Sequence, residues 1–153
     1  MDSKLKHLEL IQGVINRLAS DSFRMKGWTV VLVAAVFVFL ARQNAFEAGY
    51  IALLPIAAFW GLDGYFLWQE RLFRAHYDNV RTRPAENVDF AMDVRAYKGP
   101  LRLSWVGTTF SRTLVFFYGA LLAFVLVAVL GVGGEPESAA MLRGVHAPTP
   151  GNG

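Results

Sequence analysis

The sequence predicts an all-α membrane protein with three transmembrane helices, and three observations support this fold class. Hydrophobic residues make up 54% of the 153 residues. Charged residues make up only 18%, below the roughly 25% that is usual for soluble domains. The apolar residues also gather in three blocks separated by charged segments, which is typical of a chain that crosses a bilayer repeatedly.

We expect the first two spans at residues 27–41 and 48–68. The first is short, roughly 22 Å of helix at 1.5 Å per residue, so Lys26 and Arg42 must extend their charged ends to opposite interfaces. The second contains Pro55, which we expect to kink the helix and which membrane helices tolerate.

The third span, residues 114–132, contains no charged residue. Residues 133–153 are rich in Gly, Pro, Ala and Ser, and we expect them to form a disordered tail. The predicted organisation is therefore an amphipathic segment at 1–26, a membrane domain at 27–132 that includes the polar segment 69–112, and the tail.

Two amphipathic stretches lie outside the predicted spans. The first covers residues 4–22, where apolar residues recur every three or four positions, as on one face of a helix: Leu8, Ile11, Ile15 and Leu18. This stripe can pack on its own chain, on a second copy or on the lipid surface. The second stretch continues the second span beyond Trp68, with an apolar stripe from Leu72 to Val80.

The distribution of basic residues predicts the topology. Five Lys and Arg precede the first span, one lies in the first loop, eight lie between the second and third spans, and one lies in the tail. Since basic residues concentrate on the cytoplasmic side, we expect a cytoplasmic N-terminus and 69–112 segment and a periplasmic C-terminus.

Asp63 is the acidic residue placed well inside a predicted span. A carboxylate there is costly and is a candidate functional group. Arg112 enters the third span from the same side and can reach it. Asp63 is therefore either part of a structural pair, or protonated and hydrogen-bonded, or an ion-handling group.

Small residues recur every three or four positions in two of the spans, which lets helix backbones approach closely. They are Ala57, Gly61, Gly64, Gly119 and Ala123. This pattern fits packing within one subunit or a seam between subunits.

No catalytic, cofactor or metal motif is found in the sequence. The chain has no cysteine, and the histidines, His7, His76 and His146, are far apart without a ligand at the spacing of a zinc site. No phosphate-binding glycine loop or serine-nucleophile pattern occurs. Acidic residues interrupt the basic cluster at 71–83, which favours contact with lipid headgroups over nucleic acid.

The order of these blocks resembles a known family over roughly residues 6–127. The stretches that carry the resemblance are HLELIQGVINRLASDSFRMKGWTVVLVAA, LLPIAAFWGLDGYFLWQERLFRAHYDNVR, DFAMDV and FSRTLVFFYGALL. They are similar to a group of small bacterial inner-membrane proteins, some labelled RipA-like octameric membrane proteins. The resemblance implies a homo-oligomer in the inner membrane with no known catalytic activity, and it supplies no catalytic residues.

Together these observations predict a non-enzymatic, homo-oligomeric inner-membrane protein in contact with lipid. Two alternatives remain open. One is a regulated ion channel or membrane-disrupting effector, as in stress or phage defence, because the chain is small and carries Asp63. The other is an accessory subunit of a transporter or membrane complex, with an unidentified protein partner.

Overall fold

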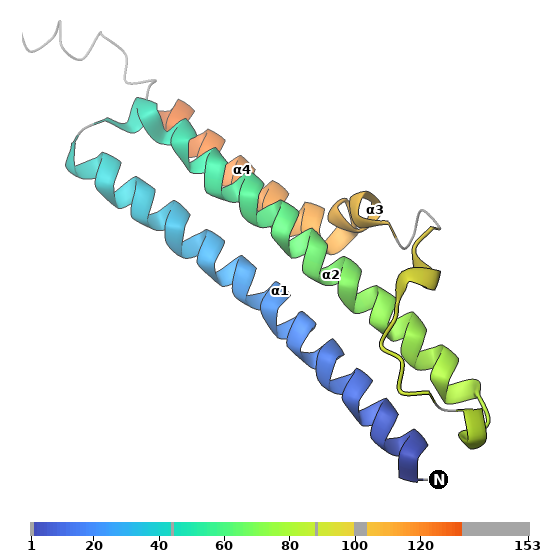
Figure 1. The fold of residues 1–153 in the computed structure, drawn as a ribbon. Coiled ribbons are helices and arrows are strands. Elements are labelled where there is room, and N and C mark those ends of the chain that lie inside the picture. Colours follow the sequence, from blue (N-terminus) through green and yellow to red (C-terminus); the bar gives the residue numbers. More distant parts are fainter. Residues whose placement is uncertain (1, 44, 88, 100–103, 133–153) are drawn as a thin grey trace, which may run out of the picture.

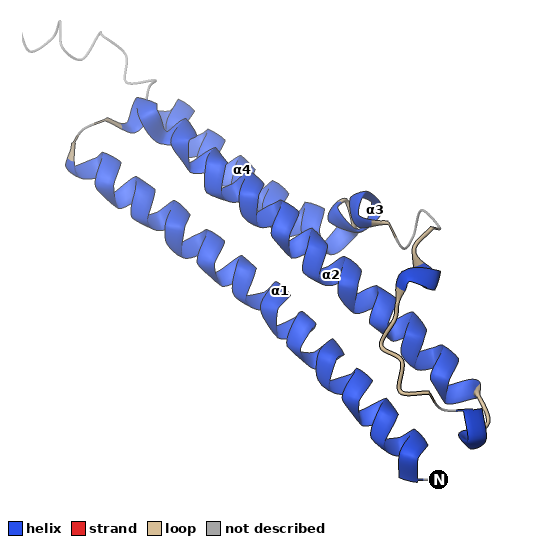
Figure 2. Ribbon diagram, in the orientation of Figure 1, coloured by secondary structure: helices blue, strands red, loops and turns tan. Residues whose placement is uncertain are grey.

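The computed structural model describes residues 2–43, 45–87, 89–99 and 104–132, and the part of the chain that it describes is helical without strands (Figures 1 and 2). The elements are α1 (Asp2–Arg42), η1 (Phe46–Ala52), α2 (Leu53–Thr82), η2 (Ala85–Asn87), η3 (Arg95–Tyr97), α3 (Trp105–Thr109) and α4 (Arg112–Val132). The predicted tail at 133–153, with His146, lies outside the described residues.

Among the described residues, three helical stretches are long and apolar enough to cross a membrane: Ser3–Arg42, Ala48–Thr82 and Arg112–Gly131. This confirms the all-helical class and the three candidate spans. The first stretch differs from the expectation, because the amphipathic segment and the first span form one continuous helix of 41 residues. Pro55 lies in the first turn of α2, directly after η1, where a proline is tolerated because the first N–H groups of an α-helix have no acceptor within that helix.

Helices α1 and α2 form a long antiparallel hairpin, and α4 lies along α2, parallel to α1 (Figure 1). Helix α4 has 21 residues, about 32 Å at 1.5 Å per residue, which matches the hydrocarbon thickness of a bilayer. Its first turn lies near Trp60, whose Nε1 donates to the Thr109 carbonyl at 2.8 Å. The hairpin therefore projects beyond the start of α4. We call this projection, residues 2–21 and 65–82, the stalk.

The buried apolar residues form two clusters. The cluster between the three spans contains Val33, Ala52, Ile56, Leu114, Tyr118 and Val125. The cluster in the stalk contains Ile11, Ile15 and Val80, with Leu8, Phe73, Tyr77 and Met92 packed against them.

The stalk cluster shows that the N-terminal stripe packs in part on its own chain, one of the three partners considered for it, and its role as an oligomer contact stays a prediction. Ile11 and Ile15 are buried against α2 of the same chain, and Leu8 packs beside them, while Leu18 is half-buried. In the stalk, the buried residues of α1 and α2 pack against each other. Two of the four stripe residues are therefore buried within one copy, and Leu8 and Leu18 are partly covered.

Candidate functional site

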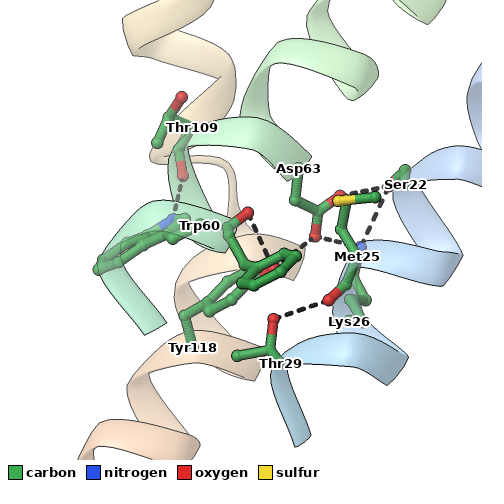
Figure 3. A network of polar contacts seen from close by, with 9 residues as sticks. Ser22, Met25, Lys26, Thr29, Trp60, Asp63, Thr109 and Tyr118 are labelled. Atoms are coloured by element: carbon green, nitrogen blue, oxygen red, sulfur yellow. Dashed lines mark hydrogen bonds and ion pairs between the residues drawn. The ribbon is translucent and has the colours of Figure 1, made fainter. Parts of the chain in front are cut away.

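The candidate site is a buried polar network around Asp63, close to the start of α4 (Figure 3). The Asp63 side chain is fully buried and forms an ion pair with Lys26, with Nζ 2.6 Å from Oδ2. The Ser22 hydroxyl donates to Oδ1. The Tyr118 hydroxyl lies 3.2 Å from both Oδ2 and the Phe59 carbonyl oxygen, and it shares its one hydrogen between these acceptors.

Helix periodicity explains how α1 supplies two of these groups. Ser22 and Lys26 are four residues apart and lie on one face of α1, where Lys26 Nζ also donates to Ser22 Oγ at 3.2 Å. One turn further, the Thr29 hydroxyl donates its hydrogen to the Met25 carbonyl at 2.7 Å, within α1. The face of α1 toward Asp63 therefore carries polar groups from Ser22 to Thr29, and the buried apolar residues of this helix in the membrane begin at Val33.

Tyr118 brings the third span to the same carboxylate. Its ring stacks on Trp60 with centroids 5.7 Å apart and planes 8° apart. The Tyr118 side chain is fully buried, so its hydroxyl needs acceptors inside the protein. Asp63 thus receives two contacts from α1, through Ser22 and Lys26, and one from α4 through Tyr118, so its side chain joins all three spans.

This arrangement is suited to holding the three helices together and not to catalysis. Both carboxylate oxygens of Asp63 are occupied by donors of the same chain, and only Lys26, with a 20% exposed side chain, connects the pair to the surroundings. A buried ion pair whose lone pairs are satisfied is tolerated, whereas removal of one partner costs about 3–5 kcal/mol. Among the described residues, no group of three or more His, Asp or Glu could hold a metal ion.

The expected pairing of Asp63 with Arg112 is wrong: the ion-pair partner is Lys26, and Arg112 is exposed at the start of α4. Tyr118 is the α4 residue that faces Asp63. At 3.6 residues per turn, a residue six positions earlier lies about 240° round the helix, so Arg112 points elsewhere. The pairing with Lys26 could have been predicted from the hairpin, because residues 26 and 63 are separated by similar numbers of residues from the turn that joins α1 to α2.

The small residues divide into two groups. Gly61 and Gly64 receive the short helix α3, not another span: the Trp105 Nε1 donates to the Gly61 carbonyl at 3.2 Å, and a Cβ on Gly64 would lie 3.0 Å from Thr109 Cα. The remaining three residues make no close packing: Ala57 and Ala123 are exposed, and a Cβ on Gly119 would meet no atom within 4 Å.

The stalk contains a second buried polar site, which sequence reasoning missed because it treated the histidines as separate. His7 and His76 lie with their ring centroids 5.8 Å apart. Their Nε2 atoms lie 3.2 and 2.8 Å from the Ala91 carbonyl oxygen. Since a carbonyl only accepts, both rings carry a hydrogen on Nε2 and donate it. The antiparallel register of the hairpin brings positions 7 and 76 together.

The backbone before Ala91 is shaped to present that carbonyl. The Ala91 N–H donates to Asp89 Oδ1 at 3.1 Å, which holds the pKa of this exposed carboxyl below its ordinary value. Between them, Phe90 has a φ of 53°, a left-handed conformation that is uncommon for a residue with a bulky side chain. The segment after α2 is thus fixed onto the stalk through this carbonyl, together with Met92, which packs on the stalk cluster, and Tyr97, whose hydroxyl lies 3.4 Å from His76 Nδ1.

No protein-family model, no curated protein sequence and no solved structure matches this chain.

Proposed function

We propose that the protein is a non-enzymatic, homo-oligomeric assembly protein of the cell inner membrane. Each copy contributes three spans and one stalk to a larger particle. The stalk lies in the cytoplasm and the end of α4 on the opposite side. The distribution of charge supports this orientation, because 13 of the 15 Lys and Arg fall in the segments before the first span and between the second and third spans.

The observation that carries the proposal is an open groove on the outer face of α1. Phe23, Arg24, Gly27, Trp28 and Val31 line it, and its volume is about 290 Å³. Gly27 forms its floor, and a Cβ there would meet no atom within 4 Å. The groove lies on the membrane half of α1, next to the turn that holds Lys26.

A helix from a second copy is the occupant that the groove fits best. Helices associate in lipid through close backbone packing, which small residues allow, and Gly27 offers an accessible backbone between the large side chains of Phe23 and Trp28. The Lys26–Asp63 pair holds the opposite side of this turn on α2, so the groove is prearranged and its outer face is presented to a neighbour.

The bonding of Asp63 argues against a channel that uses this carboxylate. An ion-conducting acid needs contact with a water-filled path. Asp63 is fully buried, and its oxygens bind Lys26, Ser22 and Tyr118. The geometry therefore supports a structural role for Asp63 inside each copy, with assembly occurring on the outer face of α1.

The test is the mass of the detergent-purified particle, measured by mass photometry at fixed protein concentration. We expect the wild type to form a multiple of the chain mass and Gly27→Leu to release single copies. Gly119→Leu is the matched control, because Gly119 is also a membrane-span glycine with open space beside it.

Three results would contradict the proposal or part of it. A single-copy wild type excludes homo-oligomerisation. If the particle keeps its mass in Gly27→Leu but dissociates in Gly119→Leu, the contact between copies lies on α4. A stoichiometric second protein in the purified wild type indicates an accessory subunit instead.

A further inference from the structure

The short helix α3 carries an apolar surface that the described part of the chain leaves uncovered. Trp105, Val106 and Phe110 are 47%, 61% and 64% exposed. With Thr109 they line a shallow groove of about 130 Å³. Contiguous apolar surface of this kind is unfavourable in water and marks contact with a membrane or another protein.

Hydrogen bonds fix α3 to α2, so the apolar surface cannot turn inward. The Trp105 side chain takes part in both, because its indole N–H bonds to α2 while 47% of the residue stays exposed. The Trp105 indole donates to the Gly61 carbonyl at 3.2 Å, and the Trp60 indole donates to the Thr109 carbonyl at 2.8 Å. The missing side chain of Gly64 leaves the space that Thr109 fills. The Ser104 hydroxyl accepts the Gly107 N–H at 3.0 Å and caps the helix.

The position of α3 indicates what covers this surface. Only two residues separate α3 from α4, so α3 lies where the third span enters the bilayer, on the side of the stalk (Figure 1). The first turns of α4 also carry exposed apolar residues, among them Phe116, which is 81% exposed. A Trp at this depth is typical of the membrane interface, and the exposed Arg112 can reach lipid phosphates.

We propose that α3 is an interfacial anchor whose Trp105, Val106 and Phe110 side chains insert into the bilayer leaflet on the stalk side. The occupant of the α3 surface is lipid, at the level where acyl chains meet headgroups. Because α3 is bonded to α2 at Gly61, two residues before Asp63, the anchor fixes the depth at which the Lys26–Asp63 pair lies.

The absence of cysteine allows a direct test with single nitroxide labels. The full chain is reconstituted in phosphatidylethanolamine–phosphatidylglycerol liposomes with a label on Val106→Cys or Phe110→Cys. Phe116→Cys is the lipid-exposed control. Asp93→Cys is the water-exposed control, because its side chain is 62% exposed and it lies in the connection that follows the stalk. Each variant must give the same particle mass as the wild type.

Oxygen concentrates in lipid, and we expect both α3 labels to have the same accessibility to oxygen as the Phe116 control. We expect their accessibility to a water-soluble nickel chelate to be several-fold lower than that of the Asp93 control. Nickel accessibility equal to that at Asp93 would place the α3 surface in water and overturn the proposal. Protection from both reagents would also overturn it, because a second copy or another protein would then cover α3.

As an independent measurement, brominated lipids should quench the fluorescence of the wild type more than that of Trp105→Phe. Equal fractional quenching of the two proteins would contradict insertion of Trp105.

Discussion

The α1–α2 hairpin is held together differently in its two halves. In the stalk, Ile11, Ile15 and Val80 pack as an apolar cluster. At the membrane boundary, the same two helices meet through Lys26 and Asp63. We attribute the difference to the surroundings of the two sites. Apolar burial drives association in water, where we propose that the stalk lies, whereas helices in lipid gain more from hydrogen bonds and close packing because lipid chains are as apolar as the side chains.

The largest expected effect is the removal of the charge at the boundary. Asp63→Asn leaves the partly buried Lys26 ammonium without its counter-charge, and breaking such a pair costs about 3–5 kcal/mol. The 20% exposure of Lys26 places this variant near the lower end of that range. Unfolding by SDS titration of the purified protein in mixed micelles measures the loss. An unchanged midpoint would show that the pair contributes little.

The stalk should respond to a change in volume instead of charge. Ile11→Ala removes a fully buried side chain and should lower the free energy of unfolding by about 2–4 kcal/mol. Leu10→Ala is the control, because Leu10 is next to it in the same helix and 52% exposed. Equal losses from the two variants, in the same titration, would mean that the stalk stripe is not the packed face.

A smaller effect is expected where α3 meets α2. Gly64→Ala places a methyl group against the backbone of Thr109, and such overpacking costs about 1–3 kcal/mol. Gly119→Ala is the matched substitution without a neighbour and should be neutral or slightly stabilising. A stabilised Gly64→Ala protein, measured by the same titration, would show that α3 does not pack closely on Gly64.

The smallest effect is expected at Arg112. Its side chain is exposed, so Arg112→Gln should change the free energy of unfolding by no more than about 0.5 kcal/mol. A loss of stability as large as that of Asp63→Asn would indicate that Arg112 pairs with Asp63 after all.

Much of this architecture could be predicted from the sequence. The hydropathy blocks predict the three spans, and the apolar stripe after Trp68 predicts the continuation of α2 to Thr82, because both depend on short-range periodicity. The presence of a costly buried charge at Asp63 was also readable, since burial at that position follows from the apolar residues around it.

The contacts that these side chains make could be predicted from the sequence less well than the helices that carry them. The choice of Lys26 over Arg112, and the meeting of His7 with His76, depend on the register of the antiparallel hairpin and on helix rotation. Local patterns do not contain that information. Ile11 and Ile15 pack within their own chain, but the same apolar stripe could equally pack on a second copy or on lipid. The choice among these depends on the tertiary structure, which a local pattern does not specify.

The most direct test of the boundary claim is a double-mutant cycle between Lys26 and Asp63. Lys26→Met and Asp63→Asn each leave one charge poorly solvated, whereas the double variant leaves none. We expect the double variant to recover part of the loss, with a coupling of about 2–3 kcal/mol, the upper part of the range for residues in contact. Additive losses in SDS titration, or an equal coupling between Arg112→Gln and Asp63→Asn, would contradict the account that a Lys26–Asp63 pair joins α1 to α2 at the membrane boundary.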